Sequence, residues 1–193
     1  MENSIIPKLV LQNRSYRRFH QEEAIPEEQL RRWVDLARLS PSGANRQPLK
    51  FILSGQPGTN DKIFPCLQWA AYLKDWGGPA EGEKPSAYII ILCDQQVAQS
   101  PGCDHGIAAQ SILLGAVEEG WGGCMLGSVN RGELRAALGI PDSFEILLVL
   151  ALGKPRETVV IEPVTDGRTP YWRDAQGVHH VPKRALDELI LKL

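Results

Sequence analysis

The stretch DHGIAAQSILLGAVEEGWGGCMLGS, from Asp104 to Ser128, joins the longest apolar segment of the chain to its densest glycine cluster. The apolar residues between Ile107 and Val117 leave no polar face wide enough for solvent, a pattern typical of a helix inside a domain. Asp104 is a suitable N-cap, and Gly120 ends the apolar pattern. We therefore expect a buried helix, too short and too interrupted to cross a membrane.

A glycine cluster follows this helix, with glycine at positions 120, 122, 123 and 127. Glycine allows the backbone to approach a ligand closely, so free N–H groups here could bind a planar heterocycle. A tight turn into an edge strand fits the spacing equally well. The chain contains neither GxGxxG after a strand nor GxxxxGK[ST], which argues against a Rossmann or P-loop nucleotide site.

The composition predicts a single globular domain over residues 1–193, because 43% of the residues are hydrophobic and 23% are charged. The net charge of −2 gives no reason to expect nucleic acid or an anionic membrane surface as a partner. The N-terminus lacks the features of a signal peptide, so a cytoplasmic location is expected. The four cysteines have no CxxC spacing and predict reduced thiols rather than a disulfide or zinc site.

Apolar spacing and capping residues predict helices on both sides of the central one. We expect a short helix over residues 4–13 and a second from Pro26 to near Leu39. Three more are expected: one over about 59–75 that is interrupted or entered at Pro65, one over 130–138 with Asn130 as cap, and a last one that starts at Pro182. Leu186, Leu189 and Ile190 have core spacing in the last of these.

The strand pattern indicates an α+β protein in which a mixed or antiparallel sheet is sandwiched by helices. Residues 87–93 and 144–152 have the continuous apolar character of strands buried on both faces, and 49–53 is a shorter strand. Residues 171–173 and 178–181 predict a small hairpin or turn, and 153–166 an extended segment that crosses the surface or a partner. The helices and strands do not alternate regularly, which excludes a doubly wound α/β fold.

Two polar segments are candidates for ligand binding. Arg14, Ser15 and Arg17 belong to a run rich in arginine, which is either a solvated basic turn or a phosphate clamp. Residues 40–48, SPSGANRQP, form a polar loop between a helix and a strand. No Ser-His-Asp set, acid–base pair or metal-ligand spacing is present, so no catalytic side chain and no metal is expected. Cys103 and His105 are close in sequence but more typical of a structural role.

Three segments together resemble the nitroreductase family of FMN-dependent oxidoreductases. They are NRSYRRF at 13–19, LARLSPSGANRQPLKF at 36–51 and DHGIAAQSILLGAVEEGWGGCMLGSVNR at 104–131. Their order and separation match the family over residues 4 to about 153, and the ending GVHHVPKR is similar to a short-chain subgroup.

The resemblance implies an intertwined homodimer with two FMN sites, each built from both chains. It implies a ping-pong cycle in which NADH or NADPH gives a hydride to flavin N5 and a nitroaromatic, quinone or similar acceptor takes the electrons. By similarity, Arg14, Ser15 and Arg17 hold the FMN phosphate and the polar edge of the ring, and Arg173 makes a further phosphate contact. The other subunit provides Pro41, Ser42, Gly43 and Asn45, while Gly123, Met125, Leu126 and Gly127 lie beside the isoalloxazine.

Three departures from the family pattern concern cofactor and substrate binding. Asn13 stands where many members have a second arginine, and Leu49 replaces a frequent tryptophan. Gly127 and Ser128 stand where the larger nitroreductases carry an acidic residue and a glycine. The acceptor and the choice of nicotinamide therefore stay open. A flavin-fragmenting enzyme, a reductive dehalogenase of the same superfamily, and a flavin-binding protein with little turnover are the alternative functions.

Overall fold

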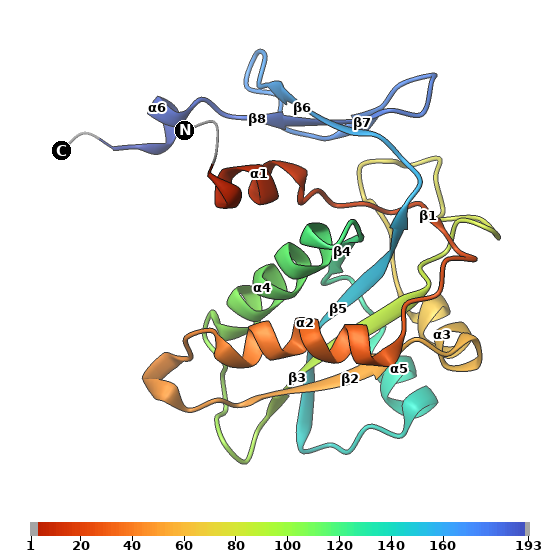
Figure 1. Ribbon diagram of the computed structural model, residues 1–193, viewed down its shortest axis with the longest axis vertical. Coiled ribbons are helices and arrows are strands. Elements are labelled where there is room, and N and C mark those ends of the chain that lie inside the picture. The colour runs from red at the N-terminus through yellow and green to blue at the C-terminus, as the bar shows by residue number, and fades with distance from the viewer. Residues whose placement is uncertain (1–3, 192–193) are drawn as a thin grey trace.

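The computed structural model describes residues 4–191, and its main sheet has five strands whose pairings are all antiparallel (Figure 1). β5 (Phe144–Pro155) pairs with β3 (Ala87–Asp94), with β4 (Gly122–Leu126) and with the two-residue β1 (Phe19–His20). β2 (Leu49–Ser54) pairs with β3. The predicted strands are thus confirmed, and the glycine cluster after the central helix also provides a strand, β4.

β3 is buried on both faces, as its apolar sequence predicts. Ala87, Ile89 and Ile91 belong to one hydrophobic cluster, whereas Tyr88 and Ile90 belong to the other. This alternation follows from the two-residue repeat of a strand. The sheet therefore separates two cores.

Helices cover both faces of the sheet, which confirms the predicted α+β class. α2 (Glu27–Leu39) and α4 (Asp104–Glu118) pack together on one face (Figure 1). α3 (Pro57–Ile63), a 3₁₀ turn at Phe64–Cys66 and α5 (Arg131–Leu138) lie on the other. The predicted start and end of α5 are confirmed, since Asn130 accepts a hydrogen bond from the backbone N–H of Glu133 and Gly139 adopts a left-handed conformation.

The helix predicted over about 59–75 is interrupted at Pro65, as expected, but the prediction that it continues to residue 75 is wrong. α3 ends at Ile63, and the chain continues through the 3₁₀ turn into irregular backbone. Pro65 has no N–H to continue a helical ladder and restricts the residue before it. Leu67 and Trp69 are nevertheless buried, as their apolar character predicts.

A second sheet has three strands and lies beside the main one. β8 (His179–Lys183) pairs parallel with β6 (Val159–Pro163) and antiparallel with β7 (Trp172–Arg173). The predicted hairpin at 171–181 is confirmed by the pairing of β7 with β8. The segment predicted to cross the surface from residue 153 contains the end of β5 and all of β6.

The helix predicted from Pro182 is wrong in its start and in its packing. Pro182 belongs to β8, and α6 is a single turn at Leu186–Leu189 with no buried residue. Leu186, Leu189 and Ile190 are 54–70% exposed, because this segment runs away from the body of the chain (Figure 1). The apolar spacing is present, but no surface within residues 4–191 buries these side chains.

α1 (Ile5–Gln12) confirms the first predicted helix, but none of its residues is buried. In α4, Cys103 occupies the N-cap position and Asp104 is the first helical residue, so the prediction of Asp104 as N-cap is wrong. Cys66, Cys93 and Cys124 are buried thiols, whereas Cys103 is exposed. Within residues 4–191 no helix combines the length and the apolar character needed to cross a bilayer.

Candidate functional site

The arginine segment after α1 lies against the glycine-rich strand β4. Ser15 forms a bridge with Gly123, and the backbone N–H of Tyr16 donates to the carbonyl oxygen of Gly123 at 3.0 Å. The structure therefore joins two of the sequence-predicted segments, 14–17 and 123–127. This junction requires close packing, because a Cβ on Gly123 would contact the carbonyl oxygen of Ala151 and lie 2.8 Å from Leu152 Cδ2.

The edge of β4 that faces away from β5 is partly free. Past the end of β4, the backbone N–H of Gln68 donates to the carbonyl oxygen of Ser128 at 3.0 Å. No strand within residues 4–191 pairs with this edge from Cys124 to Gly127. Because N–H and C=O groups alternate in direction along a strand, Met125 directs its groups off the same edge as Gly123. Met125 and Gly127 are both exposed.

A buried carboxylate connects the arginine segment to the second sheet. The side chain of Glu157 is only 1% exposed. One of its oxygens accepts hydrogen bonds from the backbone N–H groups of Arg17 and Arg18, and the other accepts from Arg173 Nη2 at 2.9 Å. Arg173 also lies over the ring of Trp76, with 4.7 Å between its Cζ and the ring centroid. Arg173 thus lies beside the arginine segment, although they are far apart in sequence.

The side chain of Arg17 contacts three other groups of this cluster. Its Nη1 donates to the carbonyl oxygen of Ser15 and lies 3.3 Å from Nε2 of His179. Its Cζ is 4.9 Å from the centroid of the Tyr171 ring. Burial, followed by the charges of Arg17 and Arg173, lowers the pKa of His179 to about 4. His179 is therefore a neutral imidazole near neutral pH.

Several buried nitrogen donors of this cluster have no hydrogen-bond partner within the described residues. They are Nε of Arg14, Arg17 and Arg173, together with Nδ1 of His179. Buried polar groups in folded proteins are almost always paired, because an unpaired one loses its hydrogen bonds to water without replacement. A phosphate or another group rich in acceptor oxygens is suited to such a set of donors. The residues present therefore fit a phosphate-bearing ligand.

Sequence reasoning missed Glu157 and His179. Glu157 follows a predicted strand without any motif, and its three hydrogen bonds come from segments distant in sequence. His179 was part of the recognised GVHHVPKR ending. Side chains alternate along a strand, so His179 and His180 must face opposite sides of β8. This alternation was the sequence feature that could have placed one of the two histidines in the site.

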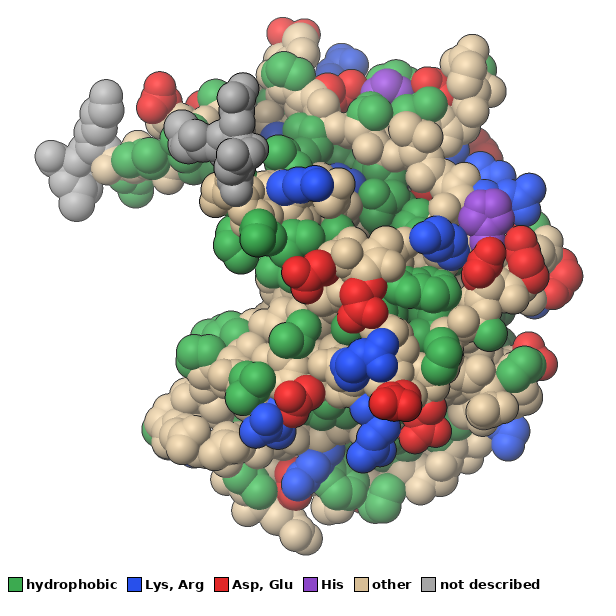
Figure 2. Space-filling view, viewed as in Figure 1, with side chains coloured by type: hydrophobic (Ala, Val, Ile, Leu, Met, Phe, Trp, Pro, Cys, Tyr) green, Lys and Arg blue, Asp and Glu red, His purple; other side chains and the backbone are tan. Residues whose placement is uncertain are grey.

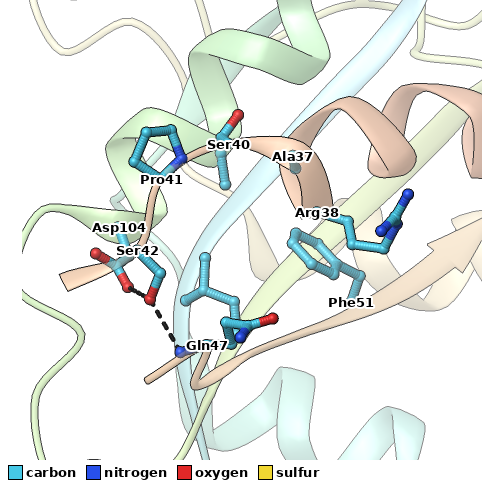
Figure 3. A pocket seen from close by; sticks show the side chains of 10 residues that line it. Ala37, Arg38, Ser40, Pro41, Ser42, Gln47, Phe51 and Asp104 are labelled. Atoms are coloured by element: carbon cyan, nitrogen blue, oxygen red, sulfur yellow. Dashed lines mark hydrogen bonds between the residues drawn. The ribbon is translucent and has the colours of Figure 1, made fainter. Parts of the chain in front are cut away.

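The second predicted segment, residues 41–45, is organised around Asp104. Ser42 Oγ donates to one Asp104 oxygen at 2.7 Å (Figure 3). Gly43 N–H donates to the other at 2.9 Å. Ser42 Oγ also accepts from Gln47 N–H at 2.9 Å. Asn45 and Gln47 have positive φ angles of 53° and 52°, an unusual conformation for residues other than glycine. These hydrogen bonds hold the loop in one conformation.

A cavity of about 170 Å³ lies under this loop. Figure 3 shows the side chains around it, which come from the end of α2, the loop itself, β2 and the start of α4. The cavity has an apolar side formed by Ala37, Leu49 and Phe51 and a polar side formed by Ser42 and Asp104. Pro41 lies at its rim beside Ser42 (Figure 3).

The two halves of the predicted site lie apart within one chain. Asp104, which holds the 41–45 loop, is at the first turn of α4, whereas Gly123 packs toward Leu113 of the same helix. At a rise of about 1.5 Å per residue, Leu113 is roughly 14 Å from Asp104 along the axis. No hydrogen bond within residues 4–191 joins the loop to Arg14, Arg17 or β4.

Comparison with known proteins gives consistent matches. The model of the family described as "Nitroreductase family" matches residues 10–72 and 96–154. A protein of Methanothermobacter thermautotrophicus described as "Putative NADH dehydrogenase/NAD(P)H nitroreductase" is 32% identical over 151 residues, which cover 75% of this chain and 74% of that protein.

Two solved structures share the fold at lower sequence identity. A nitroreductase family protein from Streptococcus pneumoniae TIGR4 has a TM-score of 0.71 and 16% identity, and the match covers 97% of this chain and 100% of that one. An FMN-dependent nitroreductase from Clostridium difficile R20291 has a TM-score of 0.64 and 22% identity, with 77% and 87% covered.

Proposed function

The chain belongs to the nitroreductase family, and we propose that it is an FMN-dependent NAD(P)H oxidoreductase formed by a single domain over residues 1–193. The observation that carries this proposal is a group of buried nitrogen donors, beside the free edge of β4, that have no hydrogen-bond partner among residues 4–191. Such donors can bind phosphate oxygens, and the free N–H and C=O groups of a strand edge can bind the polar edge of a planar ring. FMN has both a phosphate and such a ring.

In this proposal the arginine segment and the second sheet bind the phosphate end of FMN and the polar edge of its ring. Arg14 and Arg17 supply charged donors, and Ser15 holds the segment at Gly123. Arg173 adds positive charge beside them, oriented by Glu157. Charge-assisted hydrogen bonds are about twice as strong as neutral ones, which suits a phosphate monoester.

The backbone of Met125, Leu126 and Gly127 borders the flavin ring. Met125 N–H points off the free edge of β4 and would be available to donate a hydrogen bond to the flavin ring. When bound, FMN supplies the redox chemistry, taking a hydride from NADH or NADPH and passing electrons to a nitroaromatic, quinone or similar acceptor in a ping-pong cycle. The side chains of this chain bind and orient, and none is required to transfer a proton.

We further propose that two chains form the site as a homodimer, with Pro41, Ser42, Gly43 and Asn45 reaching the flavin of the partner. Support comes from the separation of the two halves along α4 and from exposed apolar surface. Exposed side chains lie on α1, at the end of α2 and on the C-terminal segment, and they include Ile5, Ile6, Leu11, Leu36, Leu39, Leu186, Leu189, Ile190 and Leu191. Figure 2 shows hydrophobic side chains around a hollow between α1 and the 40–48 loop.

Light scattering tests the dimer. An obligate dimer of this kind buries on the order of 2,000 Å² or more, so it should persist at all practical concentrations. A monodisperse monomer that still binds FMN would contradict the shared site.

Titration of FMN into cofactor-free protein, followed by NADH or NADPH under argon, tests the function. We expect saturable FMN binding and then loss of flavin absorbance as the nicotinamide is consumed. Reoxidation by a nitroaromatic or quinone should allow many turnovers without loss of FMN. A protein that binds FMN but is reduced by neither nicotinamide would instead be a flavin-binding protein, and steady consumption of the flavin would indicate a flavin-fragmenting enzyme.

A further inference from the structure

His179 lies on the inner face of β8, where it meets the arginine segment. The residue is 1% exposed, and its backbone N–H donates to the carbonyl oxygen of Thr158 at 2.9 Å. The ring of Tyr171 lies beside its imidazole at a centroid distance of 5.2 Å. The next residue, His180, stacks on Trp172 instead. The backbone and packing thus hold His179 in one position.

The contact with Arg17 determines which ring nitrogen of His179 carries the proton. Arg17 Nη1 is 3.3 Å from His179 Nε2, and a guanidinium can only donate. Nε2 must therefore accept, so the proton of the neutral ring is on Nδ1. The depressed pKa of His179, caused first by burial and then by Arg17 and Arg173, agrees with a neutral ring.

This tautomer leaves His179 with a buried donor and nothing to receive its hydrogen bond. Nδ1 has no partner within the described residues, and the adjacent Arg17 Nε has none either. A buried N–H without an acceptor destabilises the protein. The position of His179 in β8 and its Nδ1–H tautomer therefore place one neutral donor beside the charged guanidinium groups of Arg17 and Arg173.

We propose that His179 contacts the cofactor, donating its Nδ1–H to an acceptor oxygen of bound FMN. This inference rests on the proposed function, since it assumes that FMN occupies the site of Arg17. A neutral donor provides a directional hydrogen bond to an oxygen without adding a further positive charge beside Arg14, Arg17 and Arg173. His179 is thus a determinant of cofactor affinity and not only a support for Arg17.

Two substitutions distinguish a direct contact of His179 with FMN from mere support of Arg17. Each of them replaces the function of one ring nitrogen and removes the other. In His179→Gln the amide oxygen replaces Nε2 and still accepts from Arg17, but the Nδ1 donor is lost. In His179→Asn the amide nitrogen replaces Nδ1 as a donor, but the contact with Arg17 is lost. We expect FMN affinity to fall about tenfold in His179→Gln and to stay within about threefold of wild type in His179→Asn.

The opposite order, with His179→Asn binding FMN more weakly than His179→Gln, would show that His179 acts only through Arg17 and would overturn the proposal. Equal affinity in wild type and both variants would overturn it as well. Riboflavin in place of FMN locates the acceptor: a loss restricted to FMN indicates a phosphate oxygen, and an equal loss with both ligands indicates a ring oxygen.

Nitrogen-15 NMR of wild-type protein labelled at histidine reports which ring nitrogen of His179 is protonated. This measurement requires neither an activity assay nor a variant. We expect the Nδ1–H tautomer of His179 before FMN is added, and a shift of the Nδ1 signal when FMN binds. An Nε2–H tautomer, or an Nδ1 signal that does not respond to bound FMN, would overturn the assignment. Failure of the wild-type protein to bind FMN would instead overturn the proposed function itself.

Discussion

Glu157 accepts a hydrogen bond from Arg173 Nη2 at 2.9 Å, and its side chain is almost fully buried. The same carboxylate accepts the backbone N–H groups of Arg17 and Arg18. One buried acid therefore links β7, the arginine segment and the chain that follows β5. Removing its charge leaves the largely buried Arg173 guanidinium without the carboxylate that pairs with it.

We predict that Glu157→Ala lowers the free energy of unfolding by about 3 kcal/mol, because breaking a buried ion pair is costly. Urea unfolding measures this change. Glu27→Ala is the matched control, since Glu27 pairs with Arg31 on the exposed surface of α2, where such pairs contribute about 0–1 kcal/mol. Similar losses in both variants would contradict the structural role of Glu157.

The substitution Gly123→Val tests whether packing around β4 requires a glycine at this position. Its missing Cβ would lie 2.8 Å from Leu152 Cδ2 and 3.0 Å from Leu113 Cδ2, besides contacting the carbonyl oxygen of Ala151. Gly123→Val should therefore destabilise the protein by about 1–3 kcal/mol or more, whether or not FMN is present. Thermal unfolding of the cofactor-free variant checks this, and an unchanged melting temperature would show that the packing around Gly123 is looser than described.

Adjacent histidines in β8 should make stability depend on pH in opposite directions. Hydrogen bonds to Asp174 and Glu162 raise the pKa of His180, so its stabilising effect is full below about pH 6.5 and is lost as the pH rises through the raised value. Burial lowers the pKa of His179 to about 4, so its contribution is present above about pH 6.5 and is lost as the pH falls toward 4.

Urea unfolding across this pH range should show a maximum in stability between the two transitions. His180→Asn should remove mainly the decline on the alkaline side, because burial and the charges of Arg17 and Arg173, the largest causes of the lowered pKa of His179, are kept. If this variant keeps the full alkaline decline, another group is responsible for it.

The arginine segment should control cofactor affinity with little effect on the fold. Arg14 Nη2 donates only to the carbonyl oxygen of Val10 within the described residues, at 2.6 Å, so its side chain supports little tertiary structure. Arg14→Ala should weaken FMN binding roughly ten- to hundredfold, the effect of losing a charge-assisted hydrogen bond. Fluorescence titration measures the affinity, and wild-type affinity in the variant would exclude Arg14 from the site.

The parts of the fold predicted from the sequence are those that local patterns determine. The apolar run of α4, the apolar strands β3 and β5, and the caps of α5 each follow from neighbouring residues. The interruption expected at Pro65 is present, because proline lacks the N–H that continues a helix. Apolar spacing wrongly predicted that the helix resumes and extends to residue 75. The helix predicted from Pro182 failed because apolar spacing does not reveal whether a packing surface exists in the same chain.

The candidate site could be predicted only where a motif marked it. Residues 14–17 and 123–127 were both identified, and the structure joins them at Gly123. Arg173 was placed in the site by resemblance, and the structure brings it to the same cluster through Glu157. Glu157 and His179 escaped notice because their partners are remote in sequence, and strand pairing alone brings them together.

Gly127 provides the most direct test of the central claim, that FMN lies along the free edge of β4. Gly127 is exposed and outside the left-handed region, and its nearest neighbour for an added Cβ is Leu148 Cδ2 at 3.9 Å. The protein itself can therefore accept a larger side chain there. The decisive measurement is the FMN affinity of Gly127→Val, alongside the melting temperature of the cofactor-free variant. We predict an unchanged melting temperature and at least a tenfold loss of FMN affinity, with a smaller loss in Gly127→Ala. Wild-type FMN affinity in a folded Gly127→Val variant would contradict the account.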